Sequence, residues 1–462
     1  MNDNNNTLQE DELEQAVTFS PEAYISPEYA RAERDRLWRK VWLQAGRVEE
    51  VAEVGQFITY EILDDSVIIV RSSEHQINAF HNVCPHRGRR LVDVPAGKRN
   101  ASGKKQNFFC NYHGWRFDLN GDNNQIPLVE DWQGALDGCS DLSPVKMDVW
   151  GGWIWINLDP DCEPLLDYLA PAAALLDPFQ LQNMRCRWRK WGIFDCNWKV
   201  ALEAFNETYH VQTTHPEFNQ FGSFRGWGRA QGKHSNIGYD APKDMDANQA
   251  AKLRVGTEKD PRISTAELQV YTWENANTNT TQTLVDAALR LKDELPEGTP
   301  AGEVLQHWLQ SARADDEARG VVWPTVDPKV VGESGTAWQI FPNFQIGHSV
   351  NNMLCYSARP YKYDPDKCIF EGAVYQLFPK GEEPETEWQY CEATAEDWCY
   401  VLSQDFSNMA AVQQGMKSAG FSGPKPNPYM ERATANFHRN LARYMGSGAP
   451  EKLKGGPKKL KG

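Results

Sequence analysis

The sequence lacks long apolar segments and any excess of basic residues. Its best apolar run, around Gly151–Leu158, is much shorter than the roughly 20 residues that a membrane-spanning helix needs. The 48 Lys and Arg residues stand against 63 Asp and Glu residues, for a net charge of −15. Because binding to phosphates requires a basic face, we expect no nucleic-acid partner and no membrane partner.

Nucleotide-binding motifs are missing as well. No G-x-G-x-x-G pattern follows a strand and opens a helix, which argues against a dinucleotide-binding domain. A near match to a phosphate-binding loop, from Gly97 to Gly103-Lys104-Lys105, is one residue too long and lacks the Ser or Thr that would contact magnesium. If the chain needs reducing equivalents, they must therefore come from another protein.

The N-terminal stretch MNDNNNTLQEDELEQ is polar and acidic, without the basic and apolar regions of a secretory signal. We therefore expect a cytoplasmic protein. The 10 cysteines are not expected to form structural disulfides in that reducing compartment. Any cysteine with a function is expected to bind a metal.

The pattern of the sequence changes several times along the chain. Short β-forming runs separated by turns predict a small all-β domain, and a later mixture of helical and strand patterns predicts an α+β domain, an antiparallel sheet with helices on one face. Helices are expected over 27–41, 198–211 and 395–419. The expected divisions are a disordered N-terminus (1–20), an N-terminal helix that packs on the second domain (21–37), the all-β domain (38–160), the α+β domain (161–448) and a basic flexible tail (449–462).

The most specific motif is Cys84-Pro-His86 followed by Cys110-Asn-Tyr-His113. Each half supplies one thiolate and one imidazole, with a glycine shortly after it that lets the backbone turn tightly. Two thiolates on one iron and two imidazoles on the other are the ligands of a Rieske-type [2Fe–2S] cluster. Zinc accepts the same ligand types, but zinc motifs usually pair Cys with Cys and His with His.

The segment between His86 and Cys110 is longer than such clusters usually have, because of a glycine-rich basic excursion at residues 95–106. A solvated loop is the favoured interpretation. The alternative is a docking contact for an acidic ferredoxin.

A second constellation is Glu207-x-x-His210-x(4)-His215-Pro216. Five residues rotate a helix by about 140°, so the two imidazoles converge only if the helix ends between them. Pro216 disfavours helical geometry at His215, which predicts that His210 lies on the last turn and His215 in the loop beyond. Glu207, three residues before His210, is placed to orient that ring.

Two histidines and one carboxylate on one face of the metal are the ligands of non-haem ferrous oxygenases. Asp405 is the candidate carboxylate, because it lies within an apolar stripe of the helix expected over 395–419. An unpaired buried carboxylate is costly, so it should be protonated, paired or bound to a metal. The alternative is an aspartate that caps a broken helix.

Together these patterns resemble the catalytic α subunits of Rieske non-haem iron ring-hydroxylating oxygenases, over about residues 20–445. The resemblance implies an α+β fold, in which an all-β Rieske domain accompanies a helix-grip (START-like) catalytic domain with an antiparallel sheet. It implies one [2Fe–2S] cluster and one mononuclear Fe(II) in each subunit. The implied cluster ligands are Cys84, His86, Cys110 and His113, and the implied iron ligands are His210, His215 and Asp405.

The resemblance also implies a head-to-tail α3 trimer, in which Glu207 bridges His113 of one subunit and His210 of its neighbour and so carries electrons between subunits. A small β subunit, in an α3β3 assembly, is a further possibility. Arene dioxygenases of the family usually have Asp at this position, whereas Glu occurs in branches that act on other substrates. The expectation of a simple arene substrate is weakened accordingly.

The expected activity is NAD(P)H-dependent through a separate reductase, with electrons from a ferredoxin or flavin reductase. O2 would be used to cis-dihydroxylate an aromatic or other small hydrophobic ring compound. The alternative within the family is a monooxygenase or O- or N-demethylase acting on a non-arene substrate. A pure Rieske electron carrier is a third hypothesis, but it leaves the second constellation unexplained.

Overall fold

The computed structural model describes residues 8–222, 225–239, 246–256 and 259–454. The chain separates into two compact units. The small unit comprises Arg31–Leu169 and Pro360–Tyr363, and the large unit comprises Met1–Ala30, Ala170–Arg359 and Asp364–Gly462. The domain limits expected from the sequence remain predictions.

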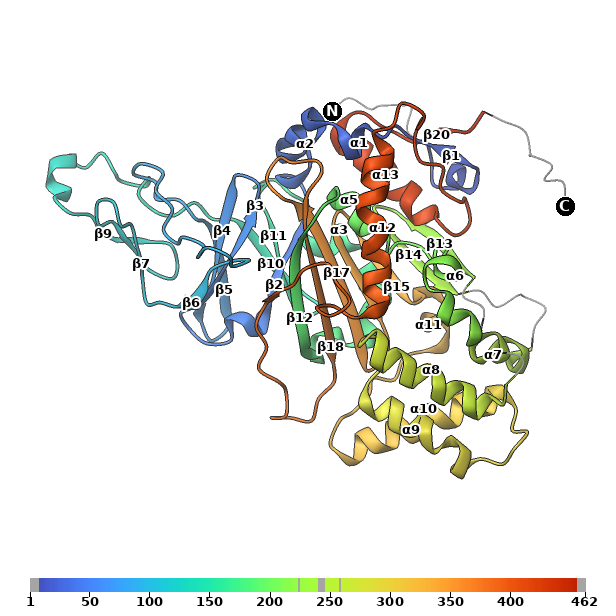
Figure 1. Cartoon of the computed structure of the whole chain (residues 1–462). Helices are drawn as coiled ribbons and strands as arrows, with labels where there is room; N and C mark the ends of the chain where they lie inside the picture. The colour runs from blue at the N-terminus through green and yellow to red at the C-terminus, as the bar shows by residue number, and fades with distance from the viewer. Residues whose placement is uncertain (1–7, 223–224, 240–245, 257–258, 455–462) are drawn as a thin grey trace. The chain divides into compact units, whose positions relative to one another are not determined.

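The small unit consists mainly of short antiparallel strands, as the turn-punctuated sequence predicts (Figure 1). One sheet has the order β5-β4-β3-β6, a second β10-β11-β2 and a third β7-β8-β9. The strands are β2 (Leu43–Arg47), β3 (Gln56–Ile62), β4 (Asp65–Ser73), β5 (Gln76–His81), β6 (Ser102–Lys104), β7 (Phe108–Phe109), β8 (Arg116–Phe117), β9 (Asn123–Gln125), β10 (Lys146–Trp150) and β11 (Trp153–Asn157).

The basic excursion at residues 95–106 is partly ordered into a strand. Within it, β6 pairs antiparallel with β3, so that Ser102 lies across from Ile58 and Lys104 from Gln56. The ammonium group of Lys104 lies 2.6 Å from the carboxylate of Glu53. A short strand with exposed lysine is a common way to end a sheet without inviting further pairing.

The large unit is built on one eight-stranded sheet with the order β13-β14-β15-β16-β17-β18-β12-β19. The pairings for which a register is given are antiparallel, apart from the parallel contact of β12 with β19. The strands are β12 (Arg185–Phe194), β13 (Gly226–Gln231), β14 (His234–Tyr239), β15 (Ala337–Ile340), β16 (Phe344–His348), β17 (Asn352–Pro360), β18 (Cys368–Gln376) and β19 (Gln389–Tyr390).

Helices α5 and α13 pack on this sheet, and α12 packs against α5. Figure 1 shows α12 and α13 in front of the strands of this sheet. The helices of the unit that surround the sheet are α1 (Glu22–Ile25), α4 (Ala172–Leu176), α5 (Trp198–Glu203), α6 (Val211–Thr214), α12 (Tyr400–Met416) and α13 (Arg432–Met445). The α+β class predicted from the sequence is confirmed. In the part of the chain that the structure describes, no helix is both long and apolar enough to cross a bilayer.

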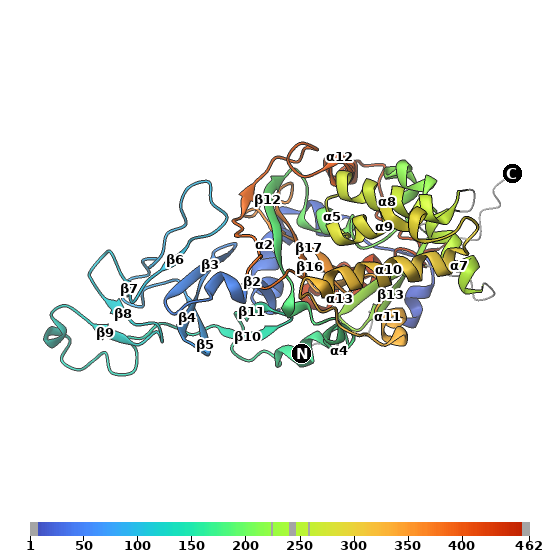
Figure 2. The same cartoon turned by 90° about the horizontal axis from the view of Figure 1, so that it is seen from below.

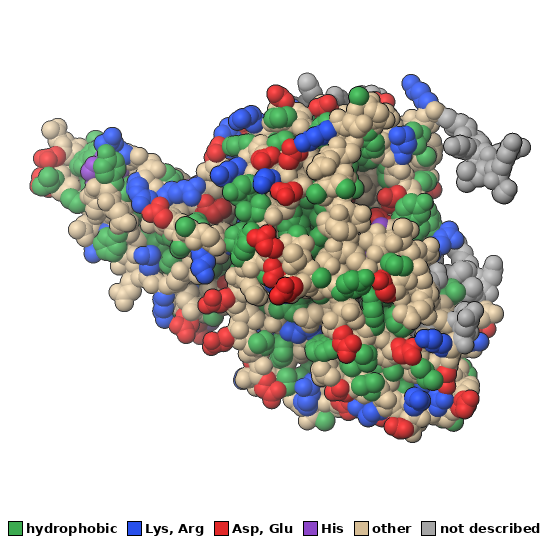
Figure 3. Space-filling model, viewed as in Figure 1, with side chains coloured by type: hydrophobic (Ala, Val, Ile, Leu, Met, Phe, Trp, Pro, Cys, Tyr) green, Lys and Arg blue, Asp and Glu red, His purple; other side chains and the backbone are tan. Residues whose placement is uncertain are grey.

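A helical insertion separates β14 from β15 (Figure 2). It contains α7 (Ala247–Val255), α8 (Pro261–Asn275), α9 (Gln282–Glu294), α10 (Ala301–Ala318) and α11 (Pro328–Ser334). On α9, Leu284, Ala287 and Leu291 are buried at helical spacing. The outer surface of the insertion mixes acidic and basic side chains (Figure 3).

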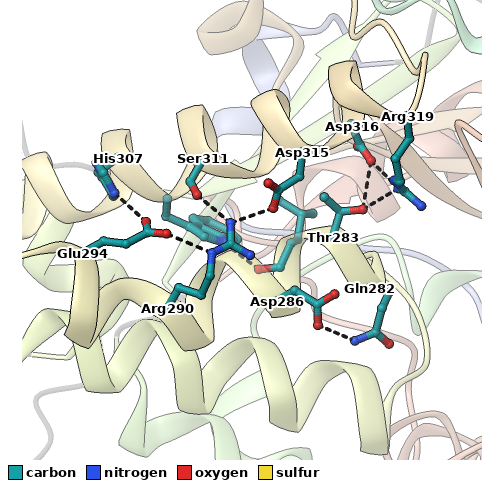
Figure 4. A network of polar contacts seen from close by, with 12 residues as sticks. Gln282, Thr283, Asp286, Arg290, Glu294, His307, Ser311, Asp315, Asp316 and Arg319 are labelled. Atoms are coloured by element: carbon teal, nitrogen blue, oxygen red, sulfur yellow. Dashed lines mark hydrogen bonds and ion pairs between the residues drawn. The ribbon is translucent and has the colours of Figure 1, made fainter.

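Polar contacts join α9 to α10 along one seam (Figure 4). Arg290 donates to Glu294 on its own helix at 2.9 Å and to Asp315 on α10 at 2.6 Å. Asp316 is buried and accepts hydrogen bonds from Thr283 and Trp323. These contacts fix how the two helices pack.

Residues 8–20 are ordered, so the expectation of disorder over 1–20 is wrong for that part; residues 1–7 lie outside the described ranges. Leu13 and Val17 are buried against Ala435 of α13. Within this stretch lie a 3-10 helix (Asp11–Glu14) and β1 (Val17–Thr18), which pairs with β20 (Glu451–Lys452). Apolar residues spaced among the acidic ones supply enough burial to order the segment. Of the expected flexible tail, residues 449–454 are described, and 455–462 are not.

The expected helices are shorter or broken. In place of 27–41 the chain forms α2 (Pro27–Glu33) and a π-helical stretch (Arg34–Trp38), α12 is five residues shorter at its start than expected over 395–419, and α3 (Leu165–Leu169) is an additional short helix. The helix expected over 198–211 ends after α5 at Glu203. The Glu207 carboxylate accepts hydrogen bonds from the backbone N–H groups of Tyr209 and His210, and such side-chain bonds compete with helical ones.

Candidate metal centres

Three candidate ligands of the second constellation meet in the large unit. The Nε2 atom of His215 lies 3.1 Å from Oδ1 of Asp405, and the Nε2 atom of His210 lies 3.5 Å from the same oxygen. One donor atom from each of the three residues lies within 4.8 Å of the others. The sequence-predicted triad is thus brought together, in space that a metal ion fits.

The two histidines flank a single helical turn. His210 is the N-cap of α6 and His215 is its C-cap, with φ −121° and ψ 62°. Pro216 then opens a 3-10 helix (Pro216–Gln220). The expected placement of His210 on the last turn of a long helix is therefore wrong, because the chain leaves α5 early and a new turn forms between the two rings.

The ring orientations of both histidines are fixed by acceptors on their other nitrogen. Nδ1 of His210 lies 2.6 Å from Oε1 of Glu207, and Nδ1 of His215 lies 2.8 Å from Oε1 of Gln404. With these acceptors on Nδ1, the Nε2 atom of each ring faces Asp405, which is the arrangement of metal-bound imidazoles. Burial lowers the pKa of His210, but the hydrogen bond and charge of Glu207 outweigh burial and raise it overall.

Gln404 is a candidate positioning residue that the motif analysis did not assign a role. Its Nε2 donates to Glu217 at 3.1 Å, and Glu217 also accepts from the hydroxyl of Tyr400 at 3.0 Å. Two adjacent residues of α12 thus belong to the site. Asp405 is a candidate ligand, and Gln404 accepts a hydrogen bond from Nδ1 of the candidate ligand His215. A glutamine in a helix carries no motif, so only its position before Asp405 was a signal.

The first constellation forms two matching loops in the small unit. In one loop, the N–H of Gly88 donates to the carbonyl of Cys84 at 3.0 Å, and the N–H of Cys84 to that of Arg89 at 2.8 Å. In the other, Gly114 donates to Cys110 at 2.9 Å, and Cys110 to Trp115 at 2.8 Å. Gly88 and Gly114 have φ values of +75° and +76°, which favour glycine.

The loops direct two thiols and two imidazoles toward one another. The rings of His86 and His113 are 4.6 Å apart between centroids, and His86 stacks on Trp115 at 5.0 Å. Cys84 and Cys110 are buried within the hydrophobic core of the unit. Burial, and then the hydrogen bond with Cys110, raise the pKa of Cys84 to about 11.

Comparison with known proteins matches both constellations to families. Residues 176–447, more than half of the chain, match the model of the ring hydroxylating alpha subunit (catalytic domain), and residues 41–136 match the Rieske [2Fe-2S] domain. The chain belongs to the ring-hydroxylating α-subunit family. A subunit of this family carries one Rieske [2Fe–2S] cluster and one mononuclear iron.

The relatives are enzymes with different substrates. The glycine betaine monooxygenase oxygenase subunit of Chromohalobacter salexigens is 31% identical over 195 residues, 42% of each chain. The carnitine monooxygenase oxygenase subunit of Escherichia coli K12 is 27% identical over 209 residues, 45% of this chain and 54% of that one. The benzene 1,2-dioxygenase subunit alpha of Pseudomonas putida is 30% identical over 210 residues, 44% and 45% of the two chains. The matched segment thus spans about half or less of each relative.

Solved structures share the fold over nearly the whole chain. The quaternary ammonium Rieske monooxygenase CntA in complex with L-carnitine has a TM-score of 0.62 at 18% identity and covers 95% of this chain and 99% of its own. Naphthalene 1,2-dioxygenase from Rhodococcus, bound to indole, has a TM-score of 0.56 at 18% identity, with 93% and 94% covered. At this identity the likeness establishes the fold alone.

The donor groups fit the two family cofactors. In the Rieske loops, Nδ1 of His86 is buried and has no hydrogen-bond partner in the described structure, as expected of a ligand nitrogen. A buried thiol with a raised pKa becomes a thiolate only beside a cation. In the iron site, the side chain of Asp405 is 5% exposed, and two imidazoles with one carboxylate match ferrous iron.

A cavity of about 450 Å³ opens beside the iron triad. Its lining includes Phe205, Phe218 and Tyr356, and also hydroxyl and amide side chains from the sheet and from the loop between α8 and α9. Alternate residues of β17, namely Asn352, Leu354 and Tyr356, line it, as the two-residue repeat of a strand requires. Three phenylalanines follow His215 in the sequence, at Phe218, Phe221 and Phe224. Phe218 lines the cavity, Phe221 is buried but does not line it, and Phe224 lies outside the described residues.

Proposed function

We propose that this chain is the oxygenase subunit of a Rieske monooxygenase that acts on a non-arene substrate. The similarity to glycine betaine and carnitine monooxygenase subunits carries the proposal. Glu207, in place of the shorter Asp that arene dioxygenases of the family usually have, supports it. This is the alternative of the sequence analysis, and it displaces arene cis-dihydroxylation as the preferred activity.

In this proposal the two Rieske loops hold the cluster, and His210, His215 and Asp405 hold the ferrous ion. When bound, the cluster supplies electrons one at a time and the iron supplies the activation of O2. Asp405 contributes the negative charge that favours a divalent cation in a buried site. Glu207 and Gln404 keep both imidazoles in the orientation that the ion needs.

Glu207 has a second proposed role between subunits. Its side chain is 10% exposed while it is bonded to His210, and the ring of His113 lies at the surface of the small unit. In a head-to-tail trimer, the partner subunit's His113 would bond to the same carboxylate. The chain of His113, Glu207 and His210 would then connect a cluster to the iron of the neighbouring subunit.

The proposed reaction converts a C–H bond to C–OH. One oxygen atom of O2 enters the product and the other leaves as water, which requires two electrons and two protons. When the hydroxylated carbon is a methyl group on oxygen or nitrogen, the product releases formaldehyde and the net reaction is demethylation. The electrons would come from a ferredoxin or a flavin reductase, since no dinucleotide-binding motif is visible in the chain.

Arene cis-dihydroxylation is the second candidate, favoured by the similarity to benzene 1,2-dioxygenase subunit alpha. In that reaction both oxygen atoms enter the product. A pure electron carrier is disfavoured, because residues 176–447 match a catalytic domain.

Counting the oxygen atoms decides between the two candidates. The reconstituted enzyme, with a ferredoxin and reductase, is supplied with ¹⁸O2 and with glycine betaine, carnitine, benzene and a set of alicyclic compounds. We expect products with one labelled oxygen or, for a demethylation, one equivalent of formaldehyde for each demethylated product, since the oxygen of formaldehyde itself exchanges with water. Two labelled oxygens in a cis-diol of benzene, with no single-oxygen product, would establish the dioxygenase activity instead.

A further inference from the structure

Among the described residues that line the cavity, Thr208, Thr278, His348 and Asn352 have a buried polar atom without a partner, and the last three come from the loop between α8 and α9 and from the paired strands β16 and β17. We call Thr278, His348 and Asn352 the polar wall. Oγ1 of Thr278, Nδ1 of His348 and Oδ1 of Asn352 are buried and make no hydrogen bond within the described residues, although all three residues line the cavity. The side chains are between 1% and 8% exposed.

The other ends of two of these side chains are anchored. Nε2 of His348 lies 3.0 Å from Oγ of Ser334, which also accepts from Nε1 of Trp338. Nδ2 of Asn352 donates to Oδ1 of Asn351 at 2.9 Å. The free nitrogen and the free oxygen are thus held in place and are not able to turn toward another protein group without breaking these bonds.

Thr278 is held by the backbone of its loop. Its neighbours Asn277 and Asn279 have φ values of +51° and +54°, and Arg187 of β12 donates to the carbonyl of Asn277 and, at 3.0 Å, to that of Thr280. The hydroxyl therefore stays at the edge of the cavity.

Unpaired polar groups in a buried site are costly, because they lose their hydrogen bonds to water without gaining others. They persist where water or a ligand completes their hydrogen bonds. A few such groups together with apolar and aromatic residues in the same cavity form the usual composition of a ligand pocket.

The charged residues of the cavity lining indicate which charge a ligand can carry. Among the described lining residues there is no Lys or Arg, and the two carboxylates, Glu207 and Asp405, belong to the iron site. Burial lowers the pKa of His348 to about 4, so its ring is neutral near pH 7. A carboxylate on the substrate would therefore be buried without a counter-charge in this part of the cavity, which is strongly unfavourable.

We propose that the polar wall binds a hydroxyl or keto oxygen of an uncharged alicyclic substrate. This inference rests on the proposed function and specifies its substrate class. The ring carbon skeleton would fill the apolar part of the cavity, and the oxygen at one end would orient a C–H bond of the other end toward the iron site. Betaine-like zwitterions, the substrates that the relatives' names indicate, would bind poorly.

The test compares ligands with one carbon skeleton and different polar groups. Decalin, decalol, decalone, decalin carboxylate and decalinyl trimethylammonium are titrated into the holoenzyme by isothermal calorimetry. We expect decalol or decalone to bind at least about tenfold more tightly than decalin, since a site built for hydrogen bonds rejects an analogue without them. The two charged members are expected to bind more weakly than the neutral oxygenated ones.

Variants then locate the effect. Thr278→Val removes the hydroxyl at nearly constant volume and is expected to weaken decalol binding about tenfold while leaving decalin unchanged. Thr265→Val is the matched control, because its Oγ1 is equally buried and unpartnered but it lies outside the cavity lining. His348→Gln keeps an amide near the position of Nε2 and removes Nδ1, whereas His348→Asn does the reverse.

Three results would overturn the polar-wall proposal: tightest binding by a charged member, no binding by either neutral oxygenated member, or an unchanged ratio of decalol affinity to decalin affinity in Thr278→Val.

The ¹⁸O2 experiment separates failure of the polar-wall proposal from failure of the proposed function. Preferred binding of decalol together with products that carry two labelled oxygens would refute the monooxygenase and leave the polar wall standing. A product of carnitine with one labelled oxygen, together with no binding of the neutral oxygenated members, would support the monooxygenase and refute the polar-wall proposal.

Discussion

The two metal constellations are built in different ways. Each Rieske loop supplies two ligands within four residues, and its own backbone hydrogen bonds close it around a glycine. The iron site takes two histidines from one turn and its carboxylate from α12, and the orienting pair His215 and Gln404 is 189 positions apart in sequence. One site is local and repeated, and the other depends on the packing of distant elements.

That difference predicts how each site responds to substitutions. The geometry of the Rieske loops is set by a few backbone bonds and by a small core that contains Cys84 and Cys110. The iron site exists only when α12 packs against α5 at the correct rotation, so that Asp405 and Gln404 both face the histidines. The Rieske loops should tolerate substitutions in the large unit, whereas the iron site should be sensitive to substitutions in α12.

The largest effect is expected from Asp405→Ala. Without the carboxylate, the mononuclear iron is lost while the cluster stays, so iron falls from about three to about two per chain. Iron analysis and the EPR signal of the reduced cluster measure both quantities. Glu396→Ala, at an exposed position before α12, serves as the control and should retain all three. If Asp405→Ala retains the mononuclear iron, Asp405 is not one of its ligands.

The reciprocal variant is Cys84→Ser. We expect loss of the cluster and its visible absorption, with about one iron remaining per chain in the large unit. Cys139→Ser, which changes an exposed cysteine, should leave the absorption spectrum unchanged. A loss of both metals in Cys84→Ser would mean that the two sites are not independent.

Glu207→Gln separates metal binding from electron transfer between the two metal sites. Both metals should remain, but reoxidation of the reduced cluster by O2 in single turnover should slow by up to about a hundredfold, because the charged bridge is lost. Glu207→Asp should recover part of the rate. If Glu207→Gln instead loses the mononuclear iron, the carboxylate acts mainly on His210 within its own subunit.

Gln404→Leu tests the long-range part of the iron site. Loss of the acceptor on Nδ1 of His215 should weaken iron binding about tenfold, as measured by competition with a chelator. Gln414→Leu, on an exposed face of the same helix, is the matched control. Equal iron affinity in both variants would show that α12 positions His215 without this amide.

The smallest effect is expected in the basic excursion of the small unit. Lys104→Ala removes an exposed ion pair with Glu53, and such pairs contribute little. We expect the same Tm and the same rate of cluster reduction by a ferredoxin. A slower and strongly salt-dependent reduction would favour the docking interpretation of this segment.

The same contrast explains what the sequence could predict. The candidate Rieske ligands were identifiable because their spacing along the chain brings them together, and the candidate ligand Asp405 because a lone acid in an apolar helical stripe is costly. The role of Gln404 was not identifiable, since an amide on a helix is ordinary. The non-helical backbone before His210 was missed, because no motif signals that the carboxylate of Glu207 accepts hydrogen bonds from the N–H groups of Tyr209 and His210.

The ordered N-terminal stretch and the polar wall were missed for a related reason. Leu13 and Val17 are too few to indicate a packed segment until α13 is placed beside them. Thr278, His348 and Asn352 come from a loop and two strands, and each is unremarkable in its own segment. Sites assembled from single residues of several elements leave no local pattern.

The alternation along β17 has a practical consequence for directed evolution. Asn352, Leu354 and Tyr356 face the cavity, whereas Met353 and Cys355, between them, are buried without lining it. Truncating buried residues of that kind typically costs about 2–5 kcal/mol. A combinatorial library confined to Asn352, Leu354 and Tyr356 would change side chains that line the cavity, whereas a library shifted by one codon would change only buried side chains that do not line it.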